Sequence, residues 1–433
     1  MSPIVVGLIG IFVLLFLLAI GMPIGFSMML VGFVGFTNLV TFSGASHILA
    51  KVPYAAITNY DFCVIPLFFL MAAICLVAGF GKSLFKLAYA WIGRIPGGLS
   101  VATIGACAMF AAASASTIAT ALTIGKVAIP EMKAYKYDSR LACGCVAAGG
   151  TLGILIPPSG ILIVYGIITE QSITKLFIGG IIPGIILSLI FMGLTVLWAR
   201  LNPALAPSAP STSMREKLAA IVESAEMVLL LLVVIVGLIV GWFTPTEAGA
   251  AGAFGAIVLS VIRKRLSLDG FIEAFKDTLY GAGMVFTILI GALIFNSFLA
   301  VSTIPMELAS WVSGLGLPPV IIMVLILVVY LVLGCFIDAF SMVLLTIPIF
   351  YPVVKTLGFD PIWFGIVTVL VVEIALITPP VGMNVYVIWG ISRDVPMEDI
   401  FKGIMPFLAA LIIFIAFLVA FPQVVLFLPG LMN

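Results

Sequence analysis

The sequence predicts an all-α polytopic membrane protein built from two inverted-topology repeats. Of its 433 residues, 64% are hydrophobic and only 9% are charged, whereas soluble globular proteins have about 45–50% apolar and about 25% charged residues. So few charges cannot cover a water-soluble surface of this size, so most of the outside must face lipid. A series of apolar stretches and a correspondence between the two halves of the chain supply the rest of the prediction.

Ten apolar stretches approach the ~20 residues that a helix needs to cross a bilayer core. They lie at 4–21, 24–42, 62–80, 141–168, 176–199, 226–242, 246–262, 279–301, 363–391 and 403–428. The first has no basic residue before it and leads straight into the second, so we expect a span rather than a cleaved signal peptide. Residues 44–58 and 266–280 are moderately polar and too short to span, which predicts two interfacial arm helices.

The two halves correspond when the chain is shifted against itself by 222 residues. Five prolines then coincide, where chance alone would give fewer than one: Pro23 with Pro245, Pro96 with Pro318, Pro130 with Pro352, Pro157 with Pro379 and Pro158 with Pro380. Internal repeats of this kind occur in many transporter folds. The sequence therefore predicts a first repeat at 1–201, a polar linker at 202–223 and a second repeat at 224–433.

Two further apolar stretches, 97–130 and 319–352, predict re-entrant hairpins that enter and leave the membrane on one side. After the interruption around 334–341, the return arm to Tyr351 has only about ten residues, or ~15 Å of helix, half of the ~30 Å core. Two short tilted spans are the alternative. With hairpins, each half contains five full spans, and this odd number inserts the second repeat upside down.

Basic residues indicate the orientation of these spans, because short cytoplasmic loops carry an excess of Lys and Arg. With the N-terminus outside, 16 of the 19 basic residues fall inside, and Lys51, Lys175 and Lys355 fall outside. We therefore expect both termini and the 319–352 hairpin to face the outside, and the linker and the 97–130 hairpin to face the cytoplasm.

Several functional classes are disfavoured. A net charge of +1 argues against a nucleic-acid partner. The single histidine, His47, lies in the first arm, and no CxxC pair occurs among the six cysteines, so neither a catalytic triad nor a zinc site is expected. An intramembrane enzyme would need a catalytic pair facing a cavity, and the predicted spans contain no paired aspartates. A channel would also use rings of oxygen ligands, but hairpins with half-helix ends in inverted pairs suit alternating access better. We expect no enzyme activity and no cofactor.

Four breaks in the apolar stretches predict a binding site. They are the hairpin tips at 112–117 and 335–341 and the broken spans at 149–160 and 375–384. A Pro-Pro pair flanked by glycines frees carbonyl oxygens in mid-span, and these oxygens, with nearby Ser, Thr and Asn side chains, suit a sodium ion. Half-helix N-termini would attract a carboxylate. The alternative is that these residues only kink the helices.

Asp338 is the strongest candidate for a functional residue. An unpaired carboxylate inside the core costs several kcal/mol, so we expect this one to be ion-paired, protonated or cation-bound. Its repeat counterpart is Ser116, so the two tips differ in charge. Glu373, six residues before Pro379, is a weaker candidate because its helix face could lead to water. Glu247 either caps a helix or has a functional role.

The repeat, the hairpins and three strings together resemble the large membrane subunit of the tripartite ATP-independent periplasmic (TRAP) transporters. The strings are Gly153-Ile-Leu-Ile-Pro-Pro-Ser159, Pro245-Thr-Glu-Ala-Gly-Ala250 and Thr378-Pro-Pro-Val-Gly-Met-Asn384. The resemblance implies sodium-coupled import of a small organic acid, of sialic acid or dicarboxylate type, across the bacterial inner membrane. It also implies a periplasmic substrate-binding protein and a small four-span membrane subunit as partners. In that membrane, the outside position predicted above for both termini is the periplasm.

The resemblance further implies an elevator motion of transport elements against a scaffold. The scaffold would comprise 4–42 with arm 44–58 and 226–262 with arm 266–280, and the transport elements 62–168 and 281–391, followed by the spans 176–199 and 403–428. The implied first sodium site is Ser114, Ser116, Thr117, Gly153, Pro157 and Ser159, and the second is Asp338, Ser341, Thr378, Pro379, Gly382 and Asn384. Substrate would contact Ser116, Ser159, Asp338 and Asn384. The alternative is a stand-alone ion-coupled organic anion transporter of the same superfamily.

Overall fold

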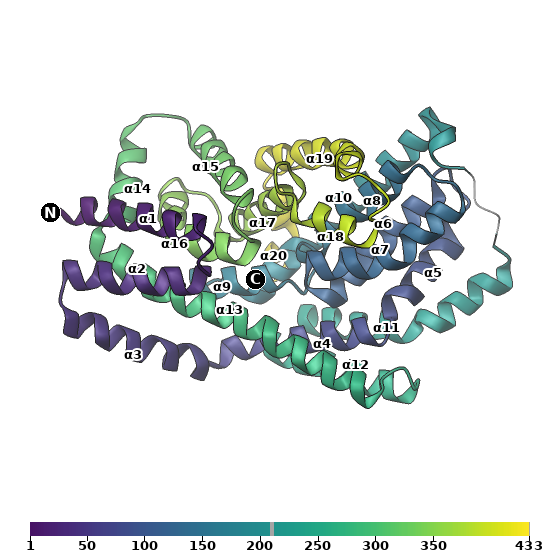
Figure 1. Cartoon of the computed structure of the whole chain (residues 1–433), viewed down its shortest axis with the longest axis horizontal. Helices are drawn as coiled ribbons and strands as arrows, with labels where there is room; N and C mark the ends of the chain where they lie inside the picture. The colour runs from purple at the N-terminus through teal and green to yellow at the C-terminus, as the bar shows by residue number, and fades with distance from the viewer. Residues whose placement is uncertain (208–211, 433) are drawn as a thin grey trace.

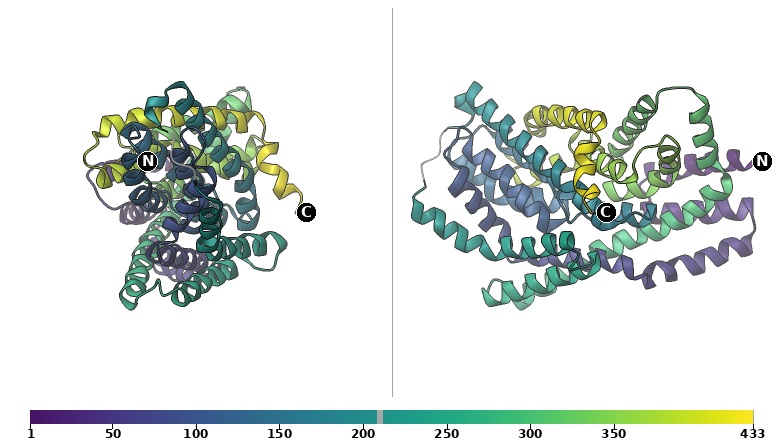
Figure 2. Two further views of the ribbon diagram at one scale, coloured as in Figure 1. Left: turned by 90° about the vertical axis from the view of Figure 1, so that its right-hand side faces the viewer. Right: turned by 180° about the vertical axis from the view of Figure 1, so that it is seen from behind.

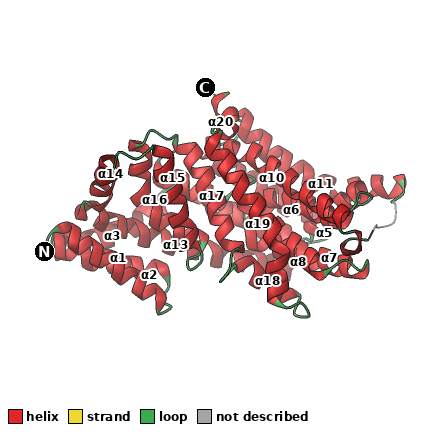
Figure 3. Ribbon diagram, turned by 90° about the horizontal axis from the view of Figure 1, so that it is seen from above, coloured by secondary structure: helices red, strands yellow, loops and turns green. Residues whose placement is uncertain are grey.

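The computed structural model describes residues 1–207 and 212–432, and within these ranges every regular element is a helix (Figure 3). Seven helical segments there are long and apolar enough to cross a membrane: Tyr60–Val77, Ile173–Leu201, Met214–Val240, Pro245–Ile262, Leu268–Ser302, Ala339–Thr356 and Met397–Ala420. The predicted all-α, multi-pass membrane protein is therefore confirmed.

The first half of the chain forms ten α-helices and three short 3₁₀ helices. They are α1 Pro3–Ala19, α2 Ile24–Leu39, α3 Phe42–Thr58, η1 Tyr60–Cys63, α4 Val64–Val77, α5 Phe80–Ile92, α6 Gly98–Ser114, α7 Thr117–Ala134, α8 Ser139–Gly150, η2 Thr151–Ile154, α9 Gly160–Thr169, α10 Ile173–Leu201 and η3 Pro203–Leu205. The predicted stretch 141–168 is thus two helices, α8 and α9, separated by η2 and an irregular turn.

The second half of the described chain forms ten α-helices. They are α11 Met214–Val240, α12 Pro245–Ile262, α13 Leu268–Ser302, α14 Ile304–Gly314, α15 Pro319–Gly334, α16 Ala339–Thr356, α17 Pro361–Ile377, α18 Met383–Ile391, α19 Met397–Ala420 and α20 Gln423–Gly430. The stretch 363–391 is again two helices, α17 and α18. The predicted span 403–428 is interrupted at 421–422, between α19 and α20.

Helices from the two halves interleave rather than form separate bodies (Figures 1 and 2). α2 lies along α13, α4 along α12 and α8 along α19, and α11 packs on α5. Small residues allow the closest of these approaches: a Cβ atom on Gly32 of α2 would lie 2.8 Å from the backbone nitrogen of Phe295 in α13. Close contact of this kind is typical of helix packing in membranes, where dispersion replaces the hydrophobic effect.

The second hairpin is longer than the sequence led us to expect. Its return arm, α16, has 18 residues and includes both Pro348 and Pro352, which corresponds to ~27 Å of helix at ~1.5 Å per residue. The argument that this arm is too short to cross was therefore wrong. The helix continues through the prolines because buried helices tolerate the lost hydrogen bonds where neighbouring groups satisfy the backbone. The first hairpin consists of α6 and α7, which meet at Ala115 and Ser116.

Only one of the two predicted arms is a separate helix. α3 matches the arm at 44–58, and it ends where the Asn59 side chain accepts a hydrogen bond of 2.9 Å from the Asp61 amide. Residues 266–280 instead continue into the following span as the 35-residue helix α13. The repeat counterparts of Asn59 and Asp61 are Gly281 and Gly283, which have no side chain to cap a new helix, so the helix does not stop.

The predicted linker at 202–223 is shorter in the structure. α10 ends at Leu201 as expected, but α11 already begins at Met214, so 214–223 is helical. Ser213 and Glu216 form a reciprocal capping box, in which the Ser213 amide donates to the Glu216 carboxylate over 2.6 Å. The Ser-x-x-Glu spacing is a recognisable start signal for a helix. Residues 208–211 of the predicted linker lie outside the described residues.

Candidate functional site

Both predicted spans are broken in the structure, but only the first break is buried. Between α8 and α9 the Pro157-Pro158 bond is cis, and between α17 and α18 the Pro379-Pro380 bond is cis. Ser159 caps α9 by accepting a hydrogen bond of 3.3 Å from the Leu162 amide. Ser159 and its neighbours Pro157 and Pro158 are buried, whereas Pro379 and Pro380 are exposed.

The tip of the first hairpin is a cluster of hydroxyl and carbonyl oxygens. The hydroxyls of Ser114 and Thr120 are 2.6 Å apart, and Ser114 Oγ also donates to the Ser116 carbonyl over 3.2 Å. Ser116 caps α7 through a bond of 3.3 Å from the Ala119 amide. Thr120 was not predicted, although its position four residues after Ser116 on one helix face was available as a signal.

The first broken span packs directly against this tip. A Cβ atom on Gly153 would lie 2.6 Å from the Ser116 carbonyl oxygen and 2.9 Å from Thr117 Cα. No larger residue fits there unless the backbone moves, since real Cβ atoms do not approach backbone atoms so closely. The structure therefore brings together Gly153, Ser116 and Thr117, three residues of the predicted first sodium site.

A residue from the second half completes the surroundings of the first tip. Thr117 Oγ1 donates a hydrogen bond of 2.7 Å to Glu373 Oε1 of α17. Glu373 is only 1% exposed, and its other oxygen, Oε2, is buried without a hydrogen-bond partner. The sequence-based hypothesis that Glu373 could face water is therefore wrong, because its side chain is buried and hydrogen-bonded to Thr117 of the first hairpin.

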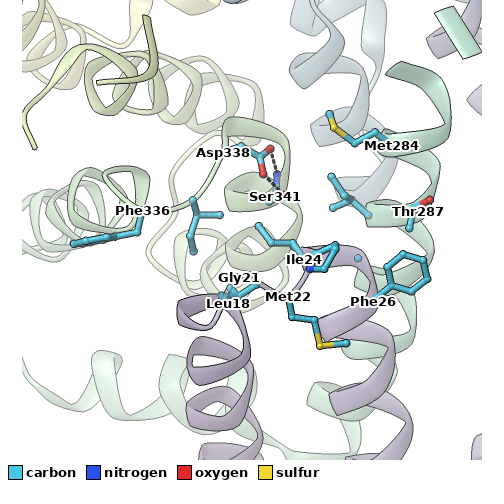
Figure 4. A pocket seen from close by; sticks show the side chains of 14 residues that line it. Leu18, Gly21, Met22, Ile24, Phe26, Met284, Thr287, Phe336, Asp338 and Ser341 are labelled. Atoms are coloured by element: carbon cyan, nitrogen blue, oxygen red, sulfur yellow. Dashed lines mark hydrogen bonds between the residues drawn. The ribbon is translucent and has the colours of Figure 1, made fainter. Parts of the chain in front are cut away.

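The tip of the second hairpin holds Asp338, which caps α16. Asp338 Oδ1 accepts a hydrogen bond of 3.1 Å from the Ser341 amide, and Oδ2 accepts one from the Ser341 hydroxyl (Figure 4). We expected an unpaired carboxylate well inside the core. The structure instead shows a hydrogen-bonded and partly exposed one, because the free amides at a helix N-terminus satisfy it.

Asp338 and Ser341 line a cavity of about 470 Å³. The opposite walls come from the turn between α1 and α2, around Pro23, and from α13 at Met284 and Thr287 (Figure 4). A cavity of this volume matches the lower range of small-molecule sites. Of the predicted substrate-binding residues only Asp338 lines it; Ser116, Ser159 and Asn384 do not.

The second broken span packs against its own hairpin at Ala375, where a Cβ atom on Gly334 would overlap the Ala375 side chain, but contacts are sparser near the prolines. The Cys335 thiol lies 4.0 Å from the Pro379 carbonyl oxygen. Thr378 Oγ1 donates a hydrogen bond of 2.6 Å to the Ile374 carbonyl oxygen of α17. Gly382 caps α18 with a φ of 57°. Asn384 is fully buried, and its Nδ2 donates to the Ala147 carbonyl of α8 over 3.2 Å, so it packs on the first half rather than on Asp338.

Charges at the two tips are not balanced by basic side chains. The ion pairs found in the described ranges are Lys86–Glu223, Lys133–Asp394, Arg140–Asp399, Arg263–Glu226 and Lys402–Asp399. None of them uses Asp338 or Glu373. Glu247, the third acid considered, forms a capping box with Thr244 at the start of α12, which accounts for it structurally.

A family model describes most of the chain. Residues 11–424 match the model of the tripartite ATP-independent periplasmic transporter, DctM component. The chain is 36% identical over 405 residues to a C4-dicarboxylate TRAP transporter large permease protein DctM of Pseudomonas aeruginosa, which covers 92% of this chain and 93% of that one. It is 32% identical over 416 residues to a sialic acid TRAP transporter large permease protein SiaM of Vibrio cholerae, covering 96% of each chain.

Solved structures of similar fold are also transporters. The Alcanivorax borkumensis YdaH transporter has a TM-score of 0.58 at 17% identity and covers 87% of this chain and 88% of its own. Neisseria gonorrhoeae MtrF has a TM-score of 0.63 at 16% identity and covers 88% and 85%. These likenesses concern the fold alone, whereas the sequence relatives are transport permeases rather than enzymes. The chain belongs to the DctM-component family of the tripartite ATP-independent periplasmic transporters.

Proposed function

We propose that this chain is the large membrane subunit of a secondary active transporter that couples sodium entry to the import of a small organic anion. The observation that carries the proposal is the pair of hairpin tips, each of which gathers several side-chain oxygens at the N-terminus of a helix. Ser114, Ser116 and Thr117 do so at α7, and Asp338 and Ser341 do so at α16. Hard oxygen ligands of this kind suit sodium.

The proposed inverted repeat is supported by helix boundaries. α7 runs over 117–134 and α16 over 339–356, so both ends are offset by the same 222 residues. Counterpart residues also have the same local role: Ser116 and Asp338 cap these two helices, and Asp138 and Asp360 cap α8 and α17. A shared length and shared caps favour two copies of one unit, at 1–201 and 224–433.

In this proposal the ions, rather than a basic side chain, neutralise the substrate. Neither hairpin tip contains lysine or arginine. A sodium ion at each tip, together with the partial positive charge of the helix N-termini, would lower the cost of placing an organic anion in the membrane interior. Uptake would therefore be coupled, because the anion binds well only after the ions have bound.

The proposed mechanism is an elevator motion. The 470 Å³ cavity lies between the second tip and the α1–α2 turn of the predicted scaffold. Because α13 is one continuous helix packed along α2, we place it with the scaffold. Movement of the two hairpins and the two broken spans against that scaffold would open or close this space and carry the loaded site across the membrane.

The proposed substrate is a small organic acid of dicarboxylate or sialic acid type. The relatives include permeases named for C4-dicarboxylates and for sialic acid, and one named for isethionate, of which this chain covers 65%. The proposed partners are a small four-span membrane subunit and a periplasmic binding protein, with the chain in the bacterial inner membrane and both termini in the periplasm. A stand-alone transporter remains the alternative.

The proposal is tested by uptake into proteoliposomes that contain the purified chain, the small subunit and the binding protein. Radiolabelled succinate, sialic acid and isethionate are the probes, each under an inward sodium gradient. We expect uptake of at least one acid that stops when sodium is replaced by potassium and when the binding protein is omitted. Uptake without the binding protein would favour the stand-alone alternative, and uptake without sodium would contradict the coupling.

A further inference from the structure

The two hairpin tips differ in charge when each half is considered alone. Asp338 places a carboxylate at the second tip, whereas its counterpart at the first tip is Ser116. The oxygens of the first tip itself belong to the hydroxyls of Ser114, Thr117 and Thr120 and to the Ser116 carbonyl, all of which are neutral. In the membrane interior, neutral ligands alone stabilise a bound cation less than a set of ligands that includes a carboxylate.

Glu373 brings the missing charge to the first tip from the other half of the chain. Its Oε1 is held by the Thr117 hydroxyl at 2.7 Å, and Oε2 is buried with no hydrogen-bond partner. The counterpart of Glu373 is Thr151, whose hydroxyl donates to the Ala148 carbonyl of the preceding helix, α8, over 2.6 Å. Both carboxylates near the tips therefore come from the second half.

In its ionised form, a carboxyl group in this position needs a compensating charge. Glu373 is 1% exposed, and the ion pairs of the described chain do not include it. An unpaired charge in such surroundings costs several kcal/mol. In Glu373, Oε1 is held by a hydrogen bond and Oε2 has no partner. This arrangement is expected of a cation ligand whose orientation is set by a neighbouring group.

We infer that Glu373 supplies the negative charge of the first sodium site, which is therefore assembled from both halves of the chain. Thr117 orients the carboxylate, and Oε2 faces the ion together with the oxygens of the tip. This inference rests on the proposed sodium coupling. It also gives the two sites one carboxylate each, Glu373 at the first and Asp338 at the second.

The test is equilibrium binding of radioactive ²²Na⁺ to the purified full chain in lipid nanodiscs, with thermal unfolding measured at each sodium concentration. Glu373→Gln keeps the size of the side chain and its hydrogen bond to Thr117 but removes the charge. We expect this variant to bind one sodium ion fewer at saturation, or to require a roughly tenfold or higher sodium concentration for half-saturation. Asp338→Asn should remove a different ion, so the double variant should lose both.

Two variants serve as matched controls. Glu131→Gln removes an exposed carboxylate from the same hairpin, at the far end of α7. Thr123→Val removes a buried hydroxyl of α7 that has no partner. Both should bind sodium as the wild type does.

The outcomes separate this inference from the proposed function. Wild-type sodium number and affinity in Glu373→Gln would overturn the inference and leave sodium coupling intact. Absence of sodium binding in the wild type would overturn the coupling itself. If Glu373→Gln does not fold, as judged by size-exclusion chromatography, Glu373→Asp keeps the charge but shortens its reach, and unchanged sodium affinity in that variant would overturn the inference.

Discussion

Thr117 and Glu373 are separated by 256 residues in the sequence and joined by a hydrogen bond of 2.7 Å between buried side chains. The bond ties the tip of the first hairpin to α17, a helix of the second half. Because the chain interleaves its halves, the first tip is not complete without the second half. A change at either tip is therefore expected to affect the transport cycle as a whole.

Replacement of Asp338 by asparagine should abolish sodium-dependent uptake while the protein still folds. Asparagine is as good an N-cap as aspartate, so the start of α16 should be retained and the loss of stability should stay below about 1 kcal/mol. What the variant loses is the negative charge at the second tip. Uptake into proteoliposomes and thermal unfolding measure the two effects, and undiminished uptake would contradict the role assigned to Asp338.

Replacement of Gly153 by alanine should separate the first broken span from the first hairpin. The new Cβ atom would lie 2.6 Å from the Ser116 carbonyl oxygen, and relief of this overlap should cost about 1–3 kcal/mol. We expect a lower unfolding temperature and strongly reduced uptake. Gly193→Ala in α10 is the control, because a Cβ atom there has nothing within 4 Å. Equal behaviour of the two variants would argue against close packing at the tip.

Cysteine labelling tests the proposed topology. A cysteine at Lys264, in the turn after α12, should react with a membrane-impermeant maleimide only from the cytoplasmic side. A cysteine at Lys355, near the end of α16, should react only from the periplasmic side. Labelling of both positions from one side would contradict the inverted repeat.

The ion pair between Lys133 and Asp394 predicts a pH dependence of stability. Lys133 Nζ lies 2.7 Å from an Asp394 carboxylate oxygen, and this hydrogen bond lowers the pKa of Asp394 below its usual range. The folded state therefore favours the charged carboxylate, so the contribution is complete above the unfolded-state pKa of about 4 and is lost as the pH falls through the lowered folded-state pKa.

The expected difference in unfolding temperature between wild type and Asp394→Asn is small, because Asp394 is largely exposed and ion pairs at the surface contribute little. It should be constant near neutral pH and disappear in acid. Thermal unfolding of both proteins from pH 3 to pH 7 measures it. A difference in unfolding temperature that grows as the pH falls would contradict the predicted direction of the pH dependence.

Local sequence signals predicted much of the architecture. Pro157-Pro158 and Pro379-Pro380 marked both broken spans, and the Ala-Ser-rich tip of the first hairpin lies where it was expected. The predicted sites were only partly brought together: Gly153 meets Ser116 and Thr117, but Asn384 packs on Ala147. The second arm was predicted as a separate helix, but α13 continues through Gly281, which has no side chain to cap a new helix. Comparison with its counterpart Asn59 explains this difference between the two arms.

Contacts between distant segments could not be predicted in the same way. Nothing near Glu373 in the sequence indicates that Thr117 lies beside it, because the contact depends on how two interleaved halves pack. The hydrogen-bond partner of Asp338, in contrast, lies only three residues away in the sequence. A helix that begins after the hairpin tip provides free amides, and the Asp338-x-x-Ser341 spacing places one of them on the carboxylate.

The most direct test of the central claim measures sodium and substrate movement together. In proteoliposomes that contain the complete transporter, addition of the binding protein loaded with its organic acid should raise the rate of ²²Na⁺ influx in proportion to acid uptake. The same addition with Asp338→Asn should have no effect. Acid uptake without any accompanying ²²Na⁺ influx would contradict sodium-coupled transport by this chain.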